Sequence, residues 1–90
     1  MRVFTKYTTI ETPRSHRKIK APAKVIEDIY KAGYYITTCN NGKYAQVCEY
    51  DPATASGRYI APLSYFISDR ICGYKDGNAL NLVRSNLIYM

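Results

Sequence analysis

The chain has 90 residues, a length typical of one small domain spanning 1–90, and its thirteen basic and seven acidic residues give a formal net charge of +6. The excess is local, because residues 1–24 hold seven Lys and Arg against one acid, Glu11, whereas residues 25–90 hold six of each sign. This distribution excludes an acidic mimic of nucleic acid. It favours an electrically balanced domain whose N-terminal quarter attracts polyanions.

Residue usage also indicates the cellular setting. Ten tyrosines accompany two phenylalanines and no tryptophan, so tyrosine rings must supply part of the core of so short a domain. The three cysteines, Cys39, Cys48 and Cys72, are an odd number without a C-x-x-C pair, which indicates a reducing compartment. Because no apolar stretch approaches the length of a membrane span, we expect a cytoplasmic protein that contacts no membrane.

The first third of the chain predicts a strand, a loop and a helix. Residues 2–10 are rich in β-branched and aromatic types, as strands are. Residues 11–21 are polar and basic, which predicts a loop or arm. The pair Ala21-Pro22 is typical of a helix start and Gly33 of a helix end. Between them the apolar residues recur at helical spacing on one face: Pro22, Val25, Ile26, Ile29 and Tyr30.

The middle of the chain predicts a β-hairpin. The segments 34–39 and 44–50 are rich in β-branched and aromatic residues, and Asn41-Gly42 between them is a strong hairpin-turn signal. A two-residue turn at this point pairs Ile36 with Val47. One face of the hairpin then carries Ile36, Ala45 and Val47, and the other carries Tyr35, Cys39, Tyr44 and Cys48. We expect the aliphatic face to cover the helix and the aromatic face to stay partly open.

The last third predicts a second helix and a final strand. Apolar residues at helical spacing between Ala61-Pro62 and Gly73 indicate an amphipathic helix, and residues 79–90 favour a strand over a helix. The element order is then β-α-β-β-α-β. This order predicts an α+β fold of the split, ferredoxin-like kind, with an antiparallel sheet and both helices on one face.

The candidate site joins the basic segment to the aromatic face of the hairpin. Several cations close together in sequence are suited to neutralising phosphates, and flat rings beside them offer a stacking surface for bases. An ordinary solvated loop and ordinary strand tyrosines are the alternative interpretation. The predicted binding residues are Arg14, Arg17, Lys18, Lys20, Lys24, Tyr35 and Tyr44.

Catalytic and metal chemistry find little support in the sequence. The single histidine, His16, has no acidic residue beside it in sequence to orient it. His16 and the three cysteines are separated by 22, 8 and 23 intervening residues, unlike the short ligand spacings of zinc sites, so we expect buried apolar thiols. We therefore predict no catalytic residues, no metal and no cofactor.

These features predict a small non-catalytic binding module. The first hypothesis is contact with nucleic acid or a nucleoprotein complex, and an acidic protein surface is a further possible partner. The alternative is an accessory protein of the phage or mobile-element type that inhibits a host protein by covering its surface, because tyrosine and arginine often anchor such interfaces. The apolar C-terminal residues 87–90 also suggest a homodimer.

Overall fold

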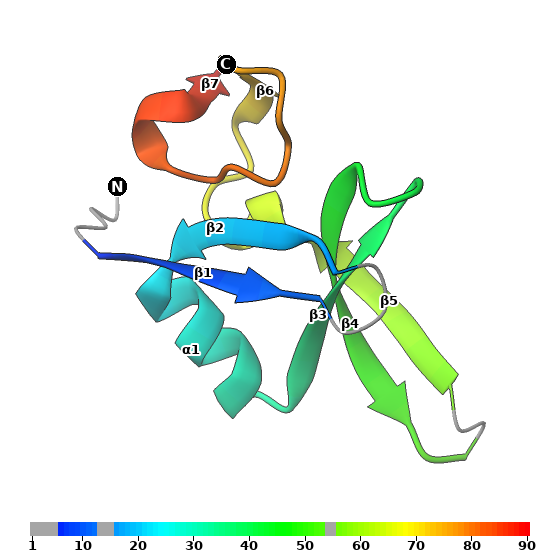
Figure 1. Ribbon diagram of the computed structural model, residues 1–90. Coiled ribbons are helices and arrows are strands. Elements are labelled where there is room, and N and C mark those ends of the chain that lie inside the picture. Colours follow the sequence, from blue (N-terminus) through cyan, green and yellow to red (C-terminus); the bar gives the residue numbers. More distant parts are fainter. Residues whose placement is uncertain (1–5, 13–15, 54–55) are drawn as a thin grey trace.

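The computed structural model describes residues 6–12, 16–53 and 56–90, which form three small antiparallel sheets and one α-helix (Figure 1). The sheets are β1-β2, β3-β4-β5 and β6-β7. The elements are β1 (Tyr7–Glu11), β2 (Lys18–Pro22), α1 (Ala23–Lys31), β3 (Tyr34–Cys39), β4 (Tyr44–Asp51), β5 (Ser56–Pro62), β6 (Ile71–Tyr74) and β7 (Leu87–Tyr89), with 3₁₀ turns η1 (Leu63–Phe66) and η2 (Arg84–Asn86).

Residues 18–21 of the basic segment belong to a strand, which corrects that part of the loop predicted over residues 11–21, whereas residues 13–15 lie outside the described part of the chain. Strand β2 pairs with β1 in a hairpin that places Glu11 opposite Lys18 and Thr9 opposite Lys20. Alternation along β2 buries Ile19 and Ala21 and leaves Lys18 and Lys20 exposed. The pattern of alternating lysine and apolar residues was therefore a strand signal, which the density of charge in this segment concealed.

The predicted first helix is confirmed. Pro22 stands at its N-cap with φ −57° and ψ 130°, and Gly33 follows its end with φ +86°. The helix buries Val25, Ile26 and Ile29. Tyr30, which was expected on the same face, is 51% exposed.

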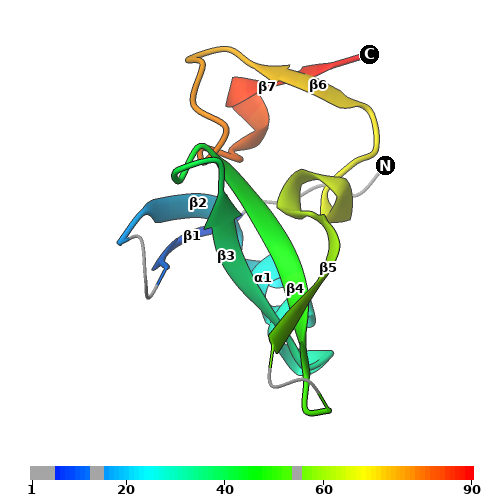
Figure 2. The same ribbon diagram turned by 90° about the vertical axis from the view of Figure 1, so that its right-hand side faces the viewer.

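The predicted hairpin is also confirmed, including its register. Ile36 lies opposite Val47, and Cys39 lies opposite Tyr44. The turn between them has positive φ at Asn40, Asn41 and Gly42, a conformation that Asn and Gly adopt most readily. Strand β5 then pairs with β4, so β4 is the central strand of this sheet. In Figure 2 the sheet stands in front of α1, and the face turned away from the helix points to the viewer.

The predicted second helix is wrong. Residues 56–62 continue the sheet as β5, and only Leu63–Phe66 form a helical turn before the chain bends away. The apolar spacing of Leu63, Phe66 and Ile67 fits one turn as well as a long helix, and Leu63 is fully buried. Beyond that turn, the Ser68 hydroxyl accepts a hydrogen bond from the Arg70 N–H at 3.1 Å. Such local side-chain bonds compete with helical ones.

The ferredoxin-like fold class is therefore wrong as well. That arrangement needs two helices on one sheet, whereas the described residues contain one α-helix and three separate sheets. Strand β1 pairs with the locally adjacent β2, and so it is not paired with the central hairpin. The predicted final strand over 79–90 is confined to Leu87–Tyr89, which pairs with β6.

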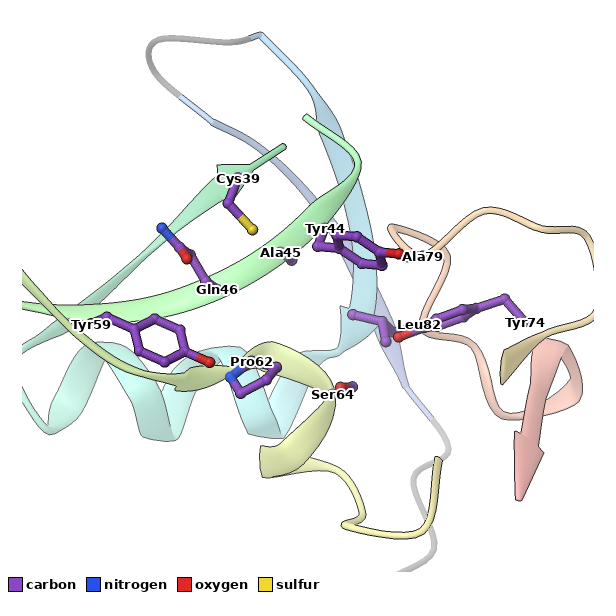
Figure 3. Close-up of a pocket in the computed structure, with 10 residues that line it drawn as sticks. All are labelled: Cys39, Tyr44, Ala45, Gln46, Tyr59, Pro62, Ser64, Tyr74, Ala79 and Leu82. Atoms are coloured by element: carbon purple, nitrogen blue, oxygen red, sulfur yellow. The ribbon is translucent and has the colours of Figure 1, made fainter. Parts of the chain in front are cut away.

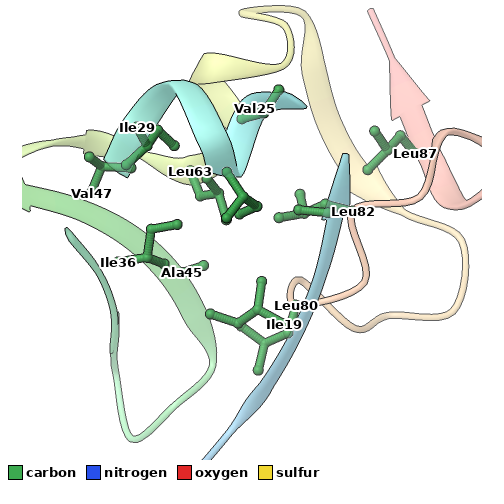
Figure 4. Packing of buried hydrophobic residues seen from close by; sticks show 12 residues of the cluster. Ile19, Val25, Ile29, Ile36, Ala45, Val47, Leu63, Leu80, Leu82 and Leu87 are labelled. Carbon is green, nitrogen blue, oxygen red and sulfur yellow. The ribbon is translucent and has the colours of Figure 1, made fainter. Parts of the chain in front are cut away.

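The core lies between β2, α1 and the inner face of the β3-β4-β5 sheet (Figure 4). The C-terminal segment closes it, because Leu80, Leu82 and Leu87 are buried in the same cluster. Two backbone bonds fix this segment to β2: Lys20 N–H donates to Leu80 O at 2.9 Å, and Leu82 N–H donates to Lys20 O at 2.7 Å. No helix in the described part of the chain is long and apolar enough to cross a membrane.

Candidate functional site

The lysines of β2 border a shallow groove beside the C-terminal segment. Lys18 and Lys20 project from the outward face of β2, and the groove of about 340 Å³ between them and the C-terminal loop is otherwise uncharged. Its other lining residues are mostly amides, hydroxyls and small apolar groups: Thr9, Asn78, Leu80, Asn81, Val83, Ser85 and Asn86. We call this surface the lysine groove. Two cations among neutral hydrogen-bonding groups are suited to contacting an anion together with polar groups around it.

The far wall of the lysine groove is held in place by Asp76. Its carboxylate accepts hydrogen bonds from Asn78 N–H at 2.8 Å, Asn86 Nδ2 at 2.9 Å and Asn81 Nδ2 at 3.0 Å. Hydrogen bonds from Asn81, then Asn78 and Asn86, hold the pKa of Asp76 below its usual value. The acid is thus ionised at neutral pH and fixes the amide side chains of the wall.

Two other predicted cations lie elsewhere. Lys24 projects from α1 and pairs with Asp28 at 3.2 Å, which makes it part of an ordinary i,i+4 helix pair. Arg14 lies outside the described residues. The structure therefore brings Lys18 and Lys20 together but places Lys24 apart from them in an ion pair.

Arg17 reaches the turn between β3 and β4. Its Nη2 donates to the carbonyl of Asn41 at 3.4 Å, and its side chain lies so close to Gly42 that a Cβ there would be 2.5 Å from Arg17 Nε. At the same turn, Lys43 Nζ lies 5.4 Å from the centre of the Tyr44 ring. Two residues that sequence reasoning had selected separately, Arg17 and Tyr44, thus meet at one end of the β3-β4 hairpin.

The predicted open tyrosine face of the hairpin is present. Tyr35 and Tyr44 are 37% and 39% exposed, and they alternate with the buried Ile36 and Ala45. The Tyr35 hydroxyl hydrogen-bonds to Cys48 on the neighbouring strand. Tyr50 of β4 and Tyr59 of β5 add further exposed rings to this sheet, which the positions on the two strands place on the same side.

The lysine groove and the tyrosine face lie on opposite sides of the core. Lys18 and Lys20 point away from the core on β2, and Tyr35 and Tyr44 point away from it on β3 and β4, while the buried residues of these strands meet between them (Figure 4). The single continuous site expected from the sequence is therefore divided. Among the described cations of the basic segment, Arg17 is the one that hydrogen-bonds to the hairpin.

A pocket of about 430 Å³ lies where the tyrosine face meets the C-terminal segment (Figure 3). The side chains of Tyr59 and Tyr74 extend toward each other across it from β5 and β6. No charged residue is among those that line it: Cys39, Tyr44, Ala45, Gln46, Tyr59, Pro62, Ser64, Tyr74, Ala79 and Leu82. We call it the tyrosine pocket. Burial raises the pKa of Tyr74, whose hydroxyl also hydrogen-bonds to Ser64, so this ring is neutral at physiological pH.

Sequence reasoning missed Tyr59, Ser64 and Tyr74 as site residues. The erroneous helix between Ala61 and Gly73 contained Ser64, and it left Tyr59 and Tyr74 unassigned to the strands β5 and β6 in which they lie. Residues 56–62 show no alternation of exposed and buried positions that would have marked β5 as a strand, and Tyr59 is exposed on it. The expected burial of all three thiols is also wrong, because Cys48 is buried, Cys39 is intermediate and Cys72 is exposed.

Comparison with known proteins gives no family. No family model matches the chain, and neither a curated protein nor a solved structure matches it significantly. The geometry of the described residues must therefore carry the argument on function.

Histidine has an acidic partner after all, which corrects the sequence interpretation. Glu11 Oε1 lies 3.0 Å from His16 Nδ1, because the β1-β2 hairpin returns the chain past Glu11. The two side chains are 52% and 76% exposed, so water reaches both groups and their interaction is weak. Among the described residues no group of three His, Cys, Asp or Glu side chains is placed to hold a metal ion.

Proposed function

We propose that the protein is a non-catalytic module that binds nucleic acid, alone or within a nucleoprotein complex. The supporting observation is how its cations are arranged. Lys24 and Lys31 on α1 pair with Asp28 and Glu27, and Arg58 pairs with Glu49. In the described part of the chain, no ion pair involves Arg17, Lys18, Lys20 or Lys43. Lys6, Arg70 and Lys75 form no ion pair there either, but they line neither the lysine groove nor the β3-β4 turn. Arg17, Lys18, Lys20 and Lys43 are therefore the cations that are both available to a polyanion and grouped at these two surfaces.

The four cations form two groups, and each group contacts a different part of the nucleic acid. Lys18 and Lys20 bind phosphates along the lysine groove. Arg17 and Lys43 bind phosphates at the end of the β3-β4 hairpin. Binding releases counterions from the nucleic acid, so affinity falls as salt rises.

Two double substitutions that remove the same number of positive charges test this proposal, so the two variants have equal net charge. The change K18Q/K20Q removes two charges from the lysine groove, and the control K24Q/K31Q removes two charges from the ion pairs of α1. We expect K18Q/K20Q to lower the slope of log K against log salt by about 1.4 for a single strand, at ~0.7 per phosphate contact. The control retains most of the slope, since a change of overall charge acts only at long range.

Fluorescence anisotropy with labelled single-stranded RNA, single-stranded DNA and duplex DNA supplies these slopes. Circular dichroism confirms that each variant is folded. Equal loss of affinity in the two double variants would show that the lysine groove has no special role. If the wild-type protein binds none of the three ligands at low salt, the proposal fails.

A protein partner is the second candidate, and the tyrosine face favours it. Tyr35, Tyr50 and Tyr59 line a broad depression of about 800 Å³ that extends from this face to Tyr30 of α1 and to the end of β1. Tyrosine is enriched at protein interfaces because its ring buries a large area while its hydroxyl still finds a partner. An inhibitor or adaptor of the accessory type would use this face rather than the lysine groove.

Affinity capture with two variants separates this candidate from the first. A partner protein that binds the tyrosine face is retained by K18Q/K20Q and lost by Y35S/Y50S. The reverse pattern indicates an acidic surface bound at the lysine groove.

The homodimer remains a further proposal: Leu87 packs into the core, whereas Ile88, Tyr89 and Met90 are 42%, 40% and 81% exposed. Sedimentation equilibrium over a range of concentrations tests it.

A further inference from the structure

We propose that the tyrosine pocket takes a nucleobase, presented by an unpaired position of a single strand. The inference rests on the proposed nucleic-acid function and adds to it the chemical group that the protein recognises. The tyrosine pocket and the lysine groove have no lining residue in common, so the two surfaces are open to separate tests.

The size and walls of the pocket fit a flat heterocycle. A volume of about 430 Å³ is in the range of small-molecule sites. Tyr59 and Tyr74 extend toward each other across it, and Tyr44 stands at a third side (Figure 3). Tyrosine rings stack on every base, because each base has a π-face. The apolar groups of Pro62 and Leu82 complete the walls.

The polar groups of the pocket fit the edge of a base better than a charged ligand. Gln46 contributes an amide that both donates and accepts, Ser64 a hydroxyl, and Tyr59 and Tyr74 phenolic hydroxyls. None of the lining residues carries a full charge at neutral pH. A base presents neutral donors and acceptors of the same kinds along its edges.

Cations beside the pocket indicate that the base arrives attached to a phosphate backbone. Lys43 lies 5.4 Å from the ring centre of Tyr44, which lines the pocket. Arg17 contacts the turn that immediately precedes Tyr44 through the carbonyl of Asn41. Both cations are exposed. A duplex keeps its bases stacked and paired, so the combination of an aromatic pocket with cations next to it points to a single strand.

Substitutions at the pocket test the inference against a matched control. Y59L and Y44L each remove one ring that lines the pocket, whereas Y65L removes a ring that is 62% exposed on η1 and lines none of the described pockets. We expect Y59L and Y44L to weaken binding of oligouridylate, oligoadenylate or oligothymidylate by about tenfold, near the lower end of the ~1–3 kcal/mol of one stacked base. Y65L binds as the wild type does. The slope with salt stays unchanged in all three, because no phosphate contact is lost.

Cysteine protection supplies an independent readout on the wild-type protein. Cys39 lines the pocket, whereas Cys72 is exposed elsewhere. A base in the pocket slows alkylation of Cys39 by iodoacetamide and leaves Cys72 unaffected. Adenosine and uridine monophosphates and the three oligonucleotides are compared, with inorganic polyphosphate as a polyanion without bases. Protection by oligonucleotides but not by polyphosphate supports the inference.

The outcomes separate the pocket from the proposed function. If oligonucleotides bind but Y59L and Y44L match the wild type and Cys39 is not protected, the inference is overturned and binding through the lysine groove stands. If no oligonucleotide binds but a free nucleoside monophosphate protects Cys39, the base in the pocket does not come from a single strand. The proposed function is then overturned as well. If neither binds, both proposals fail.

Discussion

The hydroxyl of Tyr35 occupies the space that a side chain at position 57 would need. A Cβ on Gly57 would overlap this hydroxyl, which also hydrogen-bonds to Cys48 on the strand between them. Tyr35 on β3 thus reaches across β4 to β5. This contact fixes the Tyr35 ring on the exposed face of the sheet. The tyrosine face therefore keeps its shape only if position 57 has no side chain.

A double-mutant cycle measures this contact. We expect G57A to lower the free energy of unfolding by about 1 kcal/mol, because overpacking displaces the Tyr35 ring and its hydrogen bond. In a Y35F background the same change costs less, since the nearest remaining ring atom, Cζ, is 3.2 Å from the added carbon. Urea denaturation of the wild type, both single variants and the double variant gives the coupling energy. Strictly additive effects would contradict the contact.

Gly42 and Gly33 form a matched pair for testing the position of Arg17. Both adopt positive φ, at +84° and +86°, but a Cβ at Gly42 would strike the Arg17 side chain whereas nothing lies within 4 Å of one at Gly33. We expect G42A and G33A to destabilise the protein by a similar amount, about 1–2 kcal/mol for an alanine in the left-handed region. Only G42A moves the guanidinium from the β3-β4 turn.

Nucleic-acid affinity then distinguishes the two variants. At low salt, G42A is expected to bind an oligonucleotide more weakly than G33A, because Arg17 leaves its place at the β3-β4 turn. Anisotropy titration below the unfolding temperature of both variants makes the comparison. If G33A loses as much affinity as G42A, the loss comes from reduced stability and the position of Arg17 has no role.

The central hairpin and the first helix were predictable from the sequence because local signals determine them. Asn41-Gly42 requires a tight turn, and that turn alone sets the pairing of Ile36 with Val47. The final third was not predictable in the same way. Leu63 satisfies a helical period, yet it is buried in a cluster with residues of α1, β4 and the C-terminal segment, all of them far from it in sequence.

The single site predicted from the sequence is split into the lysine groove and the tyrosine face for a related physical reason. Charge density in residues 11–21 obscured the period-two pattern in which Ile19 and Ala21 point inward between Lys18 and Lys20. Once β2 is a strand of the core, its lysines must face away from the tyrosines of β3 and β4. Arg17 precedes the strand and escapes this constraint, which is why its side chain, unlike those of Lys18 and Lys20, reaches the hairpin.

Asp76 predicts a defined dependence of stability on pH. Its pKa in the folded protein lies below the ordinary value of 3.8, mainly through the hydrogen bond from Asn81. The stabilisation is therefore complete above the unfolded pKa, declines as the pH falls through 3.8, and is lost once the pH falls below the folded pKa. In D76N an amide N–H replaces one acceptor oxygen and faces another donor, so the variant is less stable than the wild type at pH 7.

Urea denaturation of the wild type and of D76N at several pH values between 7 and 2 measures how the free energy of unfolding of each depends on pH. We expect the difference in unfolding free energy to be largest at neutral pH and to shrink in the acid range. Lys31 also lowers the pKa of Glu27. Because Glu27 is present in both proteins, its contribution cancels in the difference. A difference that stays constant down to pH 2 would contradict the assigned role of Asp76.

The three cysteines are expected to react with thiol reagents in an order set by burial. Cys72 is exposed, Cys39 lines the tyrosine pocket, and Cys48 is buried beneath Tyr35 with its pKa raised by that burial. Because the thiolate is the nucleophile, a raised pKa and exclusion from water both slow the reaction. We expect Cys72 to be alkylated first and Cys48 last. Mass spectrometry of peptides after brief iodoacetamide treatment at pH 7.5 gives the order, and treatment in urea, where all three rates converge, is the control. Native labelling of Cys48 as fast as Cys72 would mean that the tyrosine face is open down to β4, and the tyrosine pocket beside it would then lack a fixed wall.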